Sequence, residues 1–198
     1  MKKLSIIVVV AASIAPLLAG CASGGRSASP YTPLGEADRN TAEAERLTRQ
    51  AAEIMHSKPD KAEKLLREAL TRDLYYGPAH NNLGVLFLAR GDLYSAASEF
   101  EWSRKLMPGH PDPRINLALT LERAGRIDEA MRNYAAAIEV YPDHIGAMQG
   151  LVRLQVRHQR TDDRTAAMLA EIALRGENEQ WRAWAQQRAL RDPDVGAP

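Results

Sequence analysis

The sequence predicts an all-α fold, in which helical hairpins stack into a solenoid and a single helix caps the C-terminal end. Two observations predict it. The 198 residues are dominated by alanine, leucine, arginine and glutamate, and only 6% are aromatic, a composition that favours helices over strands. The pattern of small and apolar residues also recurs every 34 residues in the middle of the chain, and such a period is typical of repeat architectures.

Residues 1–20 have the form of a signal peptide. Lys2 and Lys3 give a positive start, and the apolar run Leu4–Ala19 is shorter than the roughly 20 apolar residues that a membrane-spanning helix needs. The run ends in Leu18-Ala19-Gly20-Cys21, which resembles a bacterial lipobox, the motif whose cysteine is lipidated before cleavage ahead of it. We therefore expect a lipoprotein signal peptide over 1–20 and a lipid anchor on Cys21, the only cysteine of the chain. The alternative is an ordinary cleaved signal with an incidental cysteine.

Residues 21–40 are dense in glycine, serine and proline and have no apolar periodicity, which predicts a disordered tether. A flexible chain of this length reaches roughly 25 Å, from about 5–6 Å times the square root of the residue number. The folded part should therefore stay close to the membrane. Ala22 follows the cysteine in place of the aspartate that retains enteric lipoproteins in the inner membrane. We therefore expect a cell-envelope protein on the outer membrane, facing the periplasm.

A helical domain is expected over 41–190. Its central repeats, 77–110 and 111–144, align without a gap. Small residues recur where two helices would approach closely, larger apolar residues fill the space between them, glycines suit the turns and prolines end the second helices. The recurring positions are Leu83, Gly84, Phe87, Gly91, Ala96, Phe100 and Pro108 in the first repeat and Leu117, Ala118, Leu121, Gly125, Ala130, Tyr134, Ala137 and Pro142 in the second.

The same register extends in both directions. It predicts an earlier repeat over 43–76 and a degenerate one over 145–178, in which Arg164 stands where the register expects alanine. A capping helix is expected over 177–190, with Trp181 and Trp184 on one side, because a terminal repeat must present one face to water. Residues 191–198 are expected to form a flexible tail.

The spacing of these residues resembles the tetratricopeptide repeat: a Leu-Gly pair, an aromatic residue, an alanine four residues before another aromatic residue, and a proline. The resemblance implies a right-handed α-solenoid whose first helices line a concave groove that binds a protein or peptide segment. Asparagine often stands beside the Leu-Gly pair in this family and can bond a bound peptide backbone. On this resemblance the groove consists of Asn81, Asn82, Val85, Ile115, Asn116, Leu119, Gln149, Arg153 and Arg157.

The groove is expected to be mildly apolar with an arginine-rich end. Arg153 and Arg157 have no acidic neighbour in the sequence until Asp162, which suits a partner segment with an acidic group. Trp102 lies on a second helix, where it either packs on the neighbouring repeat or projects outward as a second contact, since tryptophan is enriched at interfaces.

No motif for a catalytic nucleophile, a phosphate-binding loop or a metal site occurs in the sequence. The formal net charge of +1 gives no global attraction for nucleic acid. We therefore expect no catalytic residue, cofactor, metal or nucleic-acid partner. His110 and His144 recur at the same turn between repeats, which indicates either a metal or pH site along one edge or simply the preference of turns for polar residues.

Together these features lead us to expect a membrane-anchored scaffold or adaptor of the bacterial cell envelope. In layout the chain resembles tetratricopeptide lipoproteins that assist the assembly of pili or secretion complexes. The alternative is an adaptor that recruits peptidoglycan-modifying enzymes. An alternative of a different class, an enzyme or metal-binding protein with an unrecognised site, is disfavoured by the missing motifs.

Overall fold

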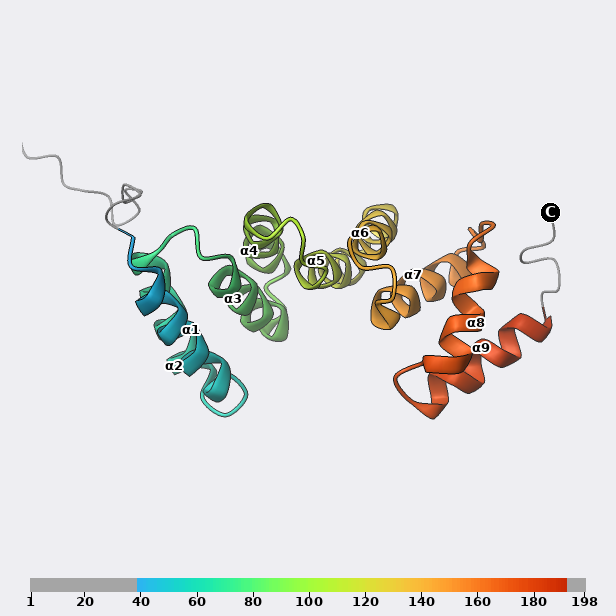
Figure 1. Cartoon of the computed structure of the whole chain (residues 1–198), viewed down its shortest axis with the longest axis horizontal. Coiled ribbons are helices and arrows are strands. Elements are labelled where there is room, and N and C mark those ends of the chain that lie inside the picture. Colours follow the sequence, from blue (N-terminus) through green and yellow to red (C-terminus); the bar gives the residue numbers. More distant parts are fainter. Residues whose placement is uncertain (1–38, 192–198) are drawn as a thin grey trace, which may run out of the picture. The chain divides into compact units, whose positions relative to one another are not determined.

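The computed structural model describes residues 39–191, and within this range the regular elements are all helices (Figure 1). The predicted all-α repeat solenoid is confirmed. The predicted signal peptide, Cys21, the tether up to residue 38 and the tail after residue 191 lie outside the described residues. The helices are α1 (Thr41–Ile54), α2 (Pro59–Arg72), α3 (Gly77–Arg90), α4 (Leu93–Leu106), α5 (Asp112–Arg123), α6 (Ile127–Val140), α7 (Ile145–Arg157), α8 (Thr165–Arg175) and α9 (Glu179–Arg191).

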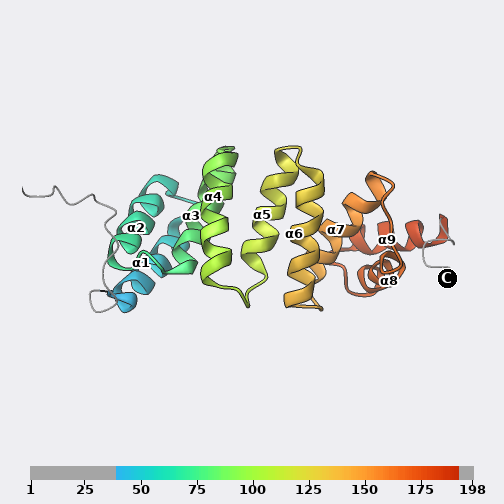
Figure 2. The ribbon, with the colours of Figure 1, turned by 90° about the horizontal axis from the view of Figure 1, so that it is seen from above.

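Each helix packs against the helices before and after it in the chain (Figure 2). The contacts are most extensive within the pairs α1–α2, α3–α4 and α5–α6, which are the hairpins of the repeat. First helices of successive hairpins also touch, α1 with α3 and α3 with α5. This pattern of contacts between neighbours along the chain is that of a solenoid.

Local sequence signals set where the central hairpins turn. Gly91 and Gly125, which follow α3 and α5, have φ angles of 80° and 75°, a left-handed conformation that glycine adopts at little cost. Asp92 then begins α4, because its carboxylate accepts a hydrogen bond from the backbone N–H of Ser95 at 3.1 Å and so caps the helix.

Small side chains allow the two helices of a hairpin to approach closely. A Cβ atom added to Gly84 on α3 would lie 2.7 Å from the ring of Phe100 on α4, so only glycine fits without a shift. Phe100 itself is fully buried. Ala118 and Ala130 are likewise fully buried in the next hairpin, beside the buried ring of Tyr134. The period of small residues in the sequence is therefore a period of close helix contacts.

The fourth hairpin departs from this pattern. Seven residues, 158–164, separate α7 from α8, whereas Gly91 and Asp92 alone separate α3 from α4. Arg164, which takes the place of Ala130 in the register, precedes α8 and is exposed. An arginine does not fit a close helix contact, and α8 accordingly begins after it.

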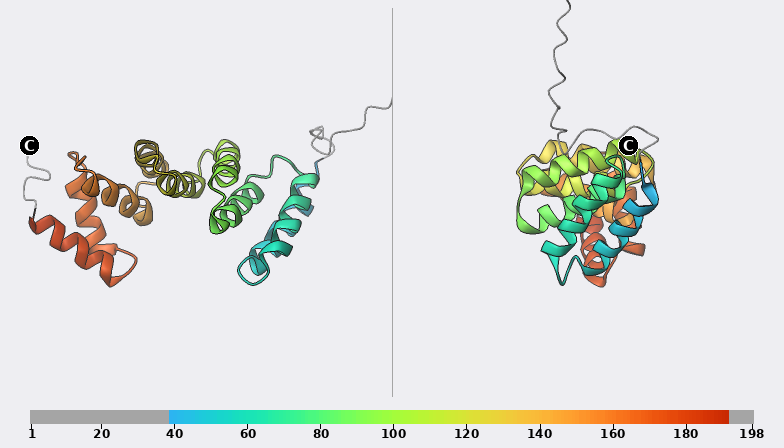
Figure 3. Two further views of the ribbon diagram at one scale, coloured as in Figure 1. Left: turned by 180° about the vertical axis from the view of Figure 1, so that it is seen from behind. Right: turned by 90° about the vertical axis from the view of Figure 1, so that its left-hand side faces the viewer.

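The last described helix, α9, begins 34 residues after α7 and so takes the register position of a first helix in a further period of the repeat. It packs on α8 (Figure 3). Ala185 is fully buried, and Trp181 and Trp184 pack edge to face, with ring centroids 5.4 Å apart, against the core.

Candidate functional site

Three asparagines on α3 and α5 form a connected row. Asn116 donates from Nδ2 to Oδ1 of Asn81 at 3.0 Å, and Asn81 donates from Nδ2 to Oδ1 of Asn82 at 3.5 Å. All three are half-buried. Oδ1 of Asn116 and Nδ2 of Asn82 make no further hydrogen bond with residues 39–191. The row therefore holds its amides in fixed orientations and still presents one acceptor and one donor.

Aliphatic side chains lie beside this row. Val85 on α3 and Ile115 and Leu119 on α5 are half-buried, each with one side packed on the core. Residues three or four apart share one side of a helix, which places Val85 with the asparagines of α3 and Leu119 with Asn116. We call these six residues the amide face: Asn81, Asn82, Val85, Ile115, Asn116 and Leu119.

At one end of the amide face, Arg153 on α7 forms a bidentate ion pair with Glu122 on α5. Its Nη1 and Nη2 atoms lie 2.6 and 2.7 Å from the two carboxylate oxygens. The expectation that Arg153 lacks an acidic partner is therefore wrong. The partner comes from the preceding repeat, 31 residues earlier, which the register of the repeats could have indicated but the local sequence does not.

The carboxylate of Glu122 lies among three guanidinium groups. The hydrogen bonds from Arg153, together with the nearby charges of Arg157 and Arg123, hold the pKa of Glu122 below its usual range. Arg157 is exposed, and Arg123 donates to the backbone carbonyl of Leu88 at 3.3 Å. We call Arg123, Arg153 and Arg157 with Glu122 the arginine end. Three positive charges surround one negative charge, so this end of the face remains net positive.

The expectation that Gln149 faces a ligand is wrong. Its side chain is buried, at 3% exposure, and its Nε2 has no hydrogen-bond partner among the described residues. The register of the repeats places it with Asn81 and Ile115, but the degenerate fourth repeat buries the position. Gln149 is thus part of the interior.

A family model described as "Tetratricopeptide repeat" matches residues 111–154. This segment spans α5, α6 and most of α7, which carry Asn116 and both partners of the central ion pair. The chain carries tetratricopeptide repeats. The remaining hairpins have the same helix pairing, as described above.

A curated relative, tetratricopeptide repeat protein 8 of Caenorhabditis elegans, is 30% identical over 76 residues, which are 38% of this chain and 14% of that protein. Among solved structures, the first tetratricopeptide domain of Spaghetti (RPAP3), bound to the HSP90 peptide SRMEEVD, superposes with a TM-score of 0.58 at 15% identity, covering 62% of this chain and 98% of that one. The Sgt2 tetratricopeptide domain of Aspergillus fumigatus gives a TM-score of 0.58 at 19% identity, covering 64% of this chain and 85% of that one.

A buried histidine lies in the hairpin formed by α3 and α4. His80 on α3 is 4% exposed. Its Nδ1 lies 2.6 Å from a carboxylate oxygen of Glu99, and its Nε2 lies 2.8 Å from the carbonyl oxygen of Leu74. Trp102, which is 45% exposed, stacks on the His80 ring with centroids 5.8 Å apart. Trp102 thus packs within its own tetratricopeptide hairpin, where the sequence suggested a neighbouring repeat or an outward contact.

The two histidines at the turns between tetratricopeptide repeats approach one carboxylate. His110 and His144 lie 3.6 and 3.8 Å from the oxygens of Asp112, which is too long for hydrogen bonds. Within residues 39–191, no three His, Cys, Asp or Glu side chains gather closely enough to hold a metal ion. No helix within the same residues is long and apolar enough to cross a membrane.

Proposed function

We propose that this chain is a protein-binding scaffold and that it binds an extended segment of its partner on the amide face and the arginine end. The observation that carries the proposal is the row of asparagines, whose outward donor and acceptor match the alternating N–H and C=O groups of an extended backbone. The half-buried aliphatic side chains beside the row would hold apolar side chains of the same segment.

The arginine end supports a partner segment with an acidic group. Arg153 is occupied by Glu122, so the group available to a ligand is Arg157, which is exposed and stands beside the pair. A carboxylate placed there would face a site with excess positive charge, and charge-assisted hydrogen bonds are stronger than neutral ones. The Spaghetti domain, similar in fold, is bound to the acidic peptide SRMEEVD, which is consistent with this chemistry.

The cellular setting is a further part of the proposal and is supported by the sequence alone. Lipid on Cys21 would anchor the scaffold in the bacterial envelope, on the outer membrane and facing the periplasm, where it would assist assembly of a pilus or secretion complex. Two or three acyl chains make such an anchor durable, since each buried CH₂ contributes about 0.8 kcal/mol.

The anchor is tested by metabolic labelling with palmitate. The wild type should incorporate label and fractionate with membranes, whereas Cys21→Ser should remain unlabelled. Label in the Cys21→Ser protein would exclude lipidation of that thiol.

The binding face is tested by site-specific cross-linking in living cells. A photo-reactive residue at Leu119 should cross-link one partner, and the same residue at Glu45, an exposed position of α1, should not. The partner is then bound to purified protein. Asn116→Ala should weaken binding by about 2- to 12-fold, because one hydrogen bond contributes roughly 0.5–1.5 kcal/mol.

Arg157→Glu should weaken binding further, because it reverses the charge that remains accessible. Both variants should retain full helicity by circular dichroism, since neither residue belongs to the core. Full affinity in a folded Asn116→Ala, Arg157→Glu double variant would show that the partner binds elsewhere.

A further inference from the structure

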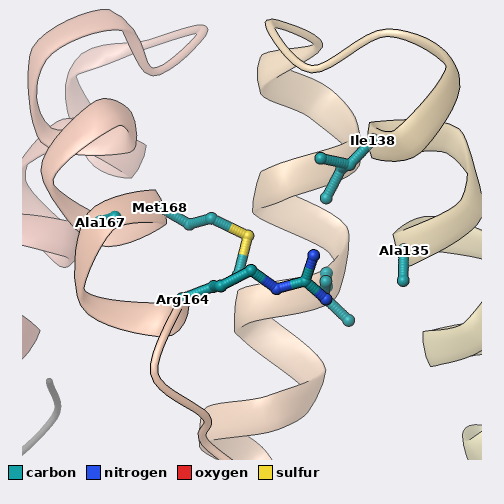
Figure 4. Close-up of a pocket in the computed structure, with 6 residues that line it drawn as sticks. Ala135, Ile138, Arg164, Ala167 and Met168 are labelled. Carbon is teal, nitrogen blue, oxygen red and sulfur yellow. The ribbon is translucent and has the colours of Figure 1, made fainter.

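A cleft of about 190 Å³ lies between α6, α7 and α8, and it contains no residue of the amide face or the arginine end (Figure 4). Ala135 and Ile138 on α6 lie on one side of it, Ala167 and Met168 on α8 lie on the other, and Leu151 on α7 also lines it. The side chain of Arg164 extends across the opening from the start of α8. The cleft is thus apolar inside with a single cation at its mouth. We call it the α6–α8 cleft.

The apolar wall on α6 is a departure from the preceding repeat. The positions equivalent to Ala135 and Ile138 on α4, one period of 34 residues earlier, are Glu101 and Arg104. These two form an ion pair on the surface of α4. A solvated helix surface would be polar in the same way. Ala135 and Ile138 pack partly on the core, and the rest of their surface leaves this side of the cleft apolar where α4 is charged.

The cation at the mouth is unpaired. The guanidinium of Arg164 makes no hydrogen bond or ion pair with the part of the chain that the structure describes. The carboxylate oxygens of nearby Asp162 are engaged by the backbone N–H of Arg164 and by Nε2 of Gln155. By contrast, Arg160 in the same linker pairs with Asp128. Arg164 is therefore placed to bind an anionic group from outside the chain.

The α6–α8 cleft and the arginine end lie on different sides of α7, and no residue of the amide face lines the cleft. Leu151, which lines the cleft, and Arg153, at the arginine end, are two residues apart on α7, and such residues point about 200° apart around a helix. A ligand in the cleft therefore leaves the amide face free.

We propose that the α6–α8 cleft binds an aliphatic side chain of a partner protein segment that carries a carboxylate next to that side chain. The apolar walls take the side chain and Arg164 takes the carboxylate, which an arginine fork can bind through two hydrogen bonds. The volume suits one large side chain. It is below the roughly 300–1,000 Å³ of pockets that enclose whole small molecules, which argues against a long acyl chain as the occupant.

The test uses two probes that differ only in charge. N-acetyl-leucine carries the side chain and the carboxylate, whereas N-acetyl-leucinamide carries the side chain alone. Binding is followed by NMR on protein labelled at the methionine methyl groups, with the Met168 signal assigned from its loss in Met168→Leu. N-acetyl-leucine should shift the Met168 signal saturably, with an affinity about three- to tenfold higher than that of the amide.

Two variants assign the interaction to the cleft. Arg164→Gln should lower the affinity for N-acetyl-leucine to that of the amide and leave the affinity for the amide unchanged. Ala167→Trp should fill the cleft and abolish the binding of both probes. Arg72→Gln, which removes an exposed arginine of α2, is the matched control and should change neither. Circular dichroism verifies that each variant is folded.

Three results would overturn the proposal: no saturable shift of Met168, equal affinities for the two probes, or no effect of Arg164→Gln. A decanoate arm distinguishes the source of the ligand, because tighter binding of decanoate than of N-acetyl-leucine would replace the peptide with a lipid. The probes report on the cleft alone, so failure here leaves the binding function of the amide face untouched, and the reverse also holds.

Discussion

The ion pair between Glu122 and Arg153 should stabilise the solenoid by more than an ordinary surface pair. The two side chains are 14% and 33% exposed and share two short hydrogen bonds. Exposed pairs contribute about 0–1 kcal/mol, whereas removing one partner of a buried pair costs about 3–5 kcal/mol. For this half-buried pair we expect a coupling energy of about 1–3 kcal/mol, discounted for the solvent that reaches Arg153.

The measurement is a double-mutant cycle by urea unfolding, with Glu122→Gln, Arg153→Met and the double variant. Arg153→Met should be the more harmful single change, because it leaves a carboxylate in a poorly solvated position. The double variant should lose less free energy of unfolding than the two single variants lose together, and the difference is the coupling energy. Glu45→Gln, which breaks the exposed pair with Arg49, should change stability by less than about 0.5 kcal/mol.

The dependence on pH provides a second measurement of the same pair. Because the folded-state pKa of Glu122 is lowered, its contribution is fully present above the unfolded value of about 4.3. It is lost as the pH falls through the lower folded value. The stability difference between wild type and Glu122→Gln should therefore be constant from pH 7 to 5 and shrink below about pH 4. A coupling energy below about 0.5 kcal/mol, or a difference that persists in acid, would refute the reasoning.

Three further predictions concern the interior. Ala130→Trp should lower the free energy of unfolding by more than about 1–3 kcal/mol, because it forces a ring into a close helix contact. Glu139→Ala on the exposed surface should lower it by less than about 0.5 kcal/mol. Equal midpoints of the two variants in thermal unfolding would contradict the register. Gln149→Met should leave stability unchanged or raise it by about 1 kcal/mol, since it removes a buried amide donor without a partner; a loss above that size would mean the amide is satisfied. Gly84→Ala should lower the unfolding midpoint in urea, because its Cβ would lie 2.7 Å from the Phe100 ring, and a neutral result would show that the ring moves aside.

The helix contacts could be predicted from the sequence because they depend on one-dimensional spacing. Small and large residues at fixed offsets, such as Gly84 with Phe100, can meet in only one hairpin geometry, and the glycine turns fix where each hairpin reverses. Side chains on the amide face could be placed by the same register, since Asn81 and Asn116 share one side of adjacent first helices.

The charged and degenerate parts could not be predicted from spacing. Arg153 has no acidic neighbour in the local sequence, because its partner, Glu122, belongs to another repeat. Which acidic group a long side chain reaches depends on the three-dimensional packing of the helices. Gln149 was expected to be accessible because the register of the two central repeats was extended into a repeat that is degenerate. The α6–α8 cleft depends on the late start of α8, and its signal in the sequence is the replacement of Glu101 and Arg104 by Ala135 and Ile138 one repeat later.

The exposed surface of α9 bears on how copies of this chain can associate. Apart from Leu190 and alanines, its exposed residues are polar, as in Gln186 and Gln187, and half of the exposed residues of α1 are charged. A solenoid with apolar ends would let the last helix of one copy stack on the first helix of the next, a head-to-tail contact that does not close and so grows into a filament. The polar residues on the exposed surfaces of α1 and α9 disfavour such stacking of the described helices, because each contact would bury polar groups without partners.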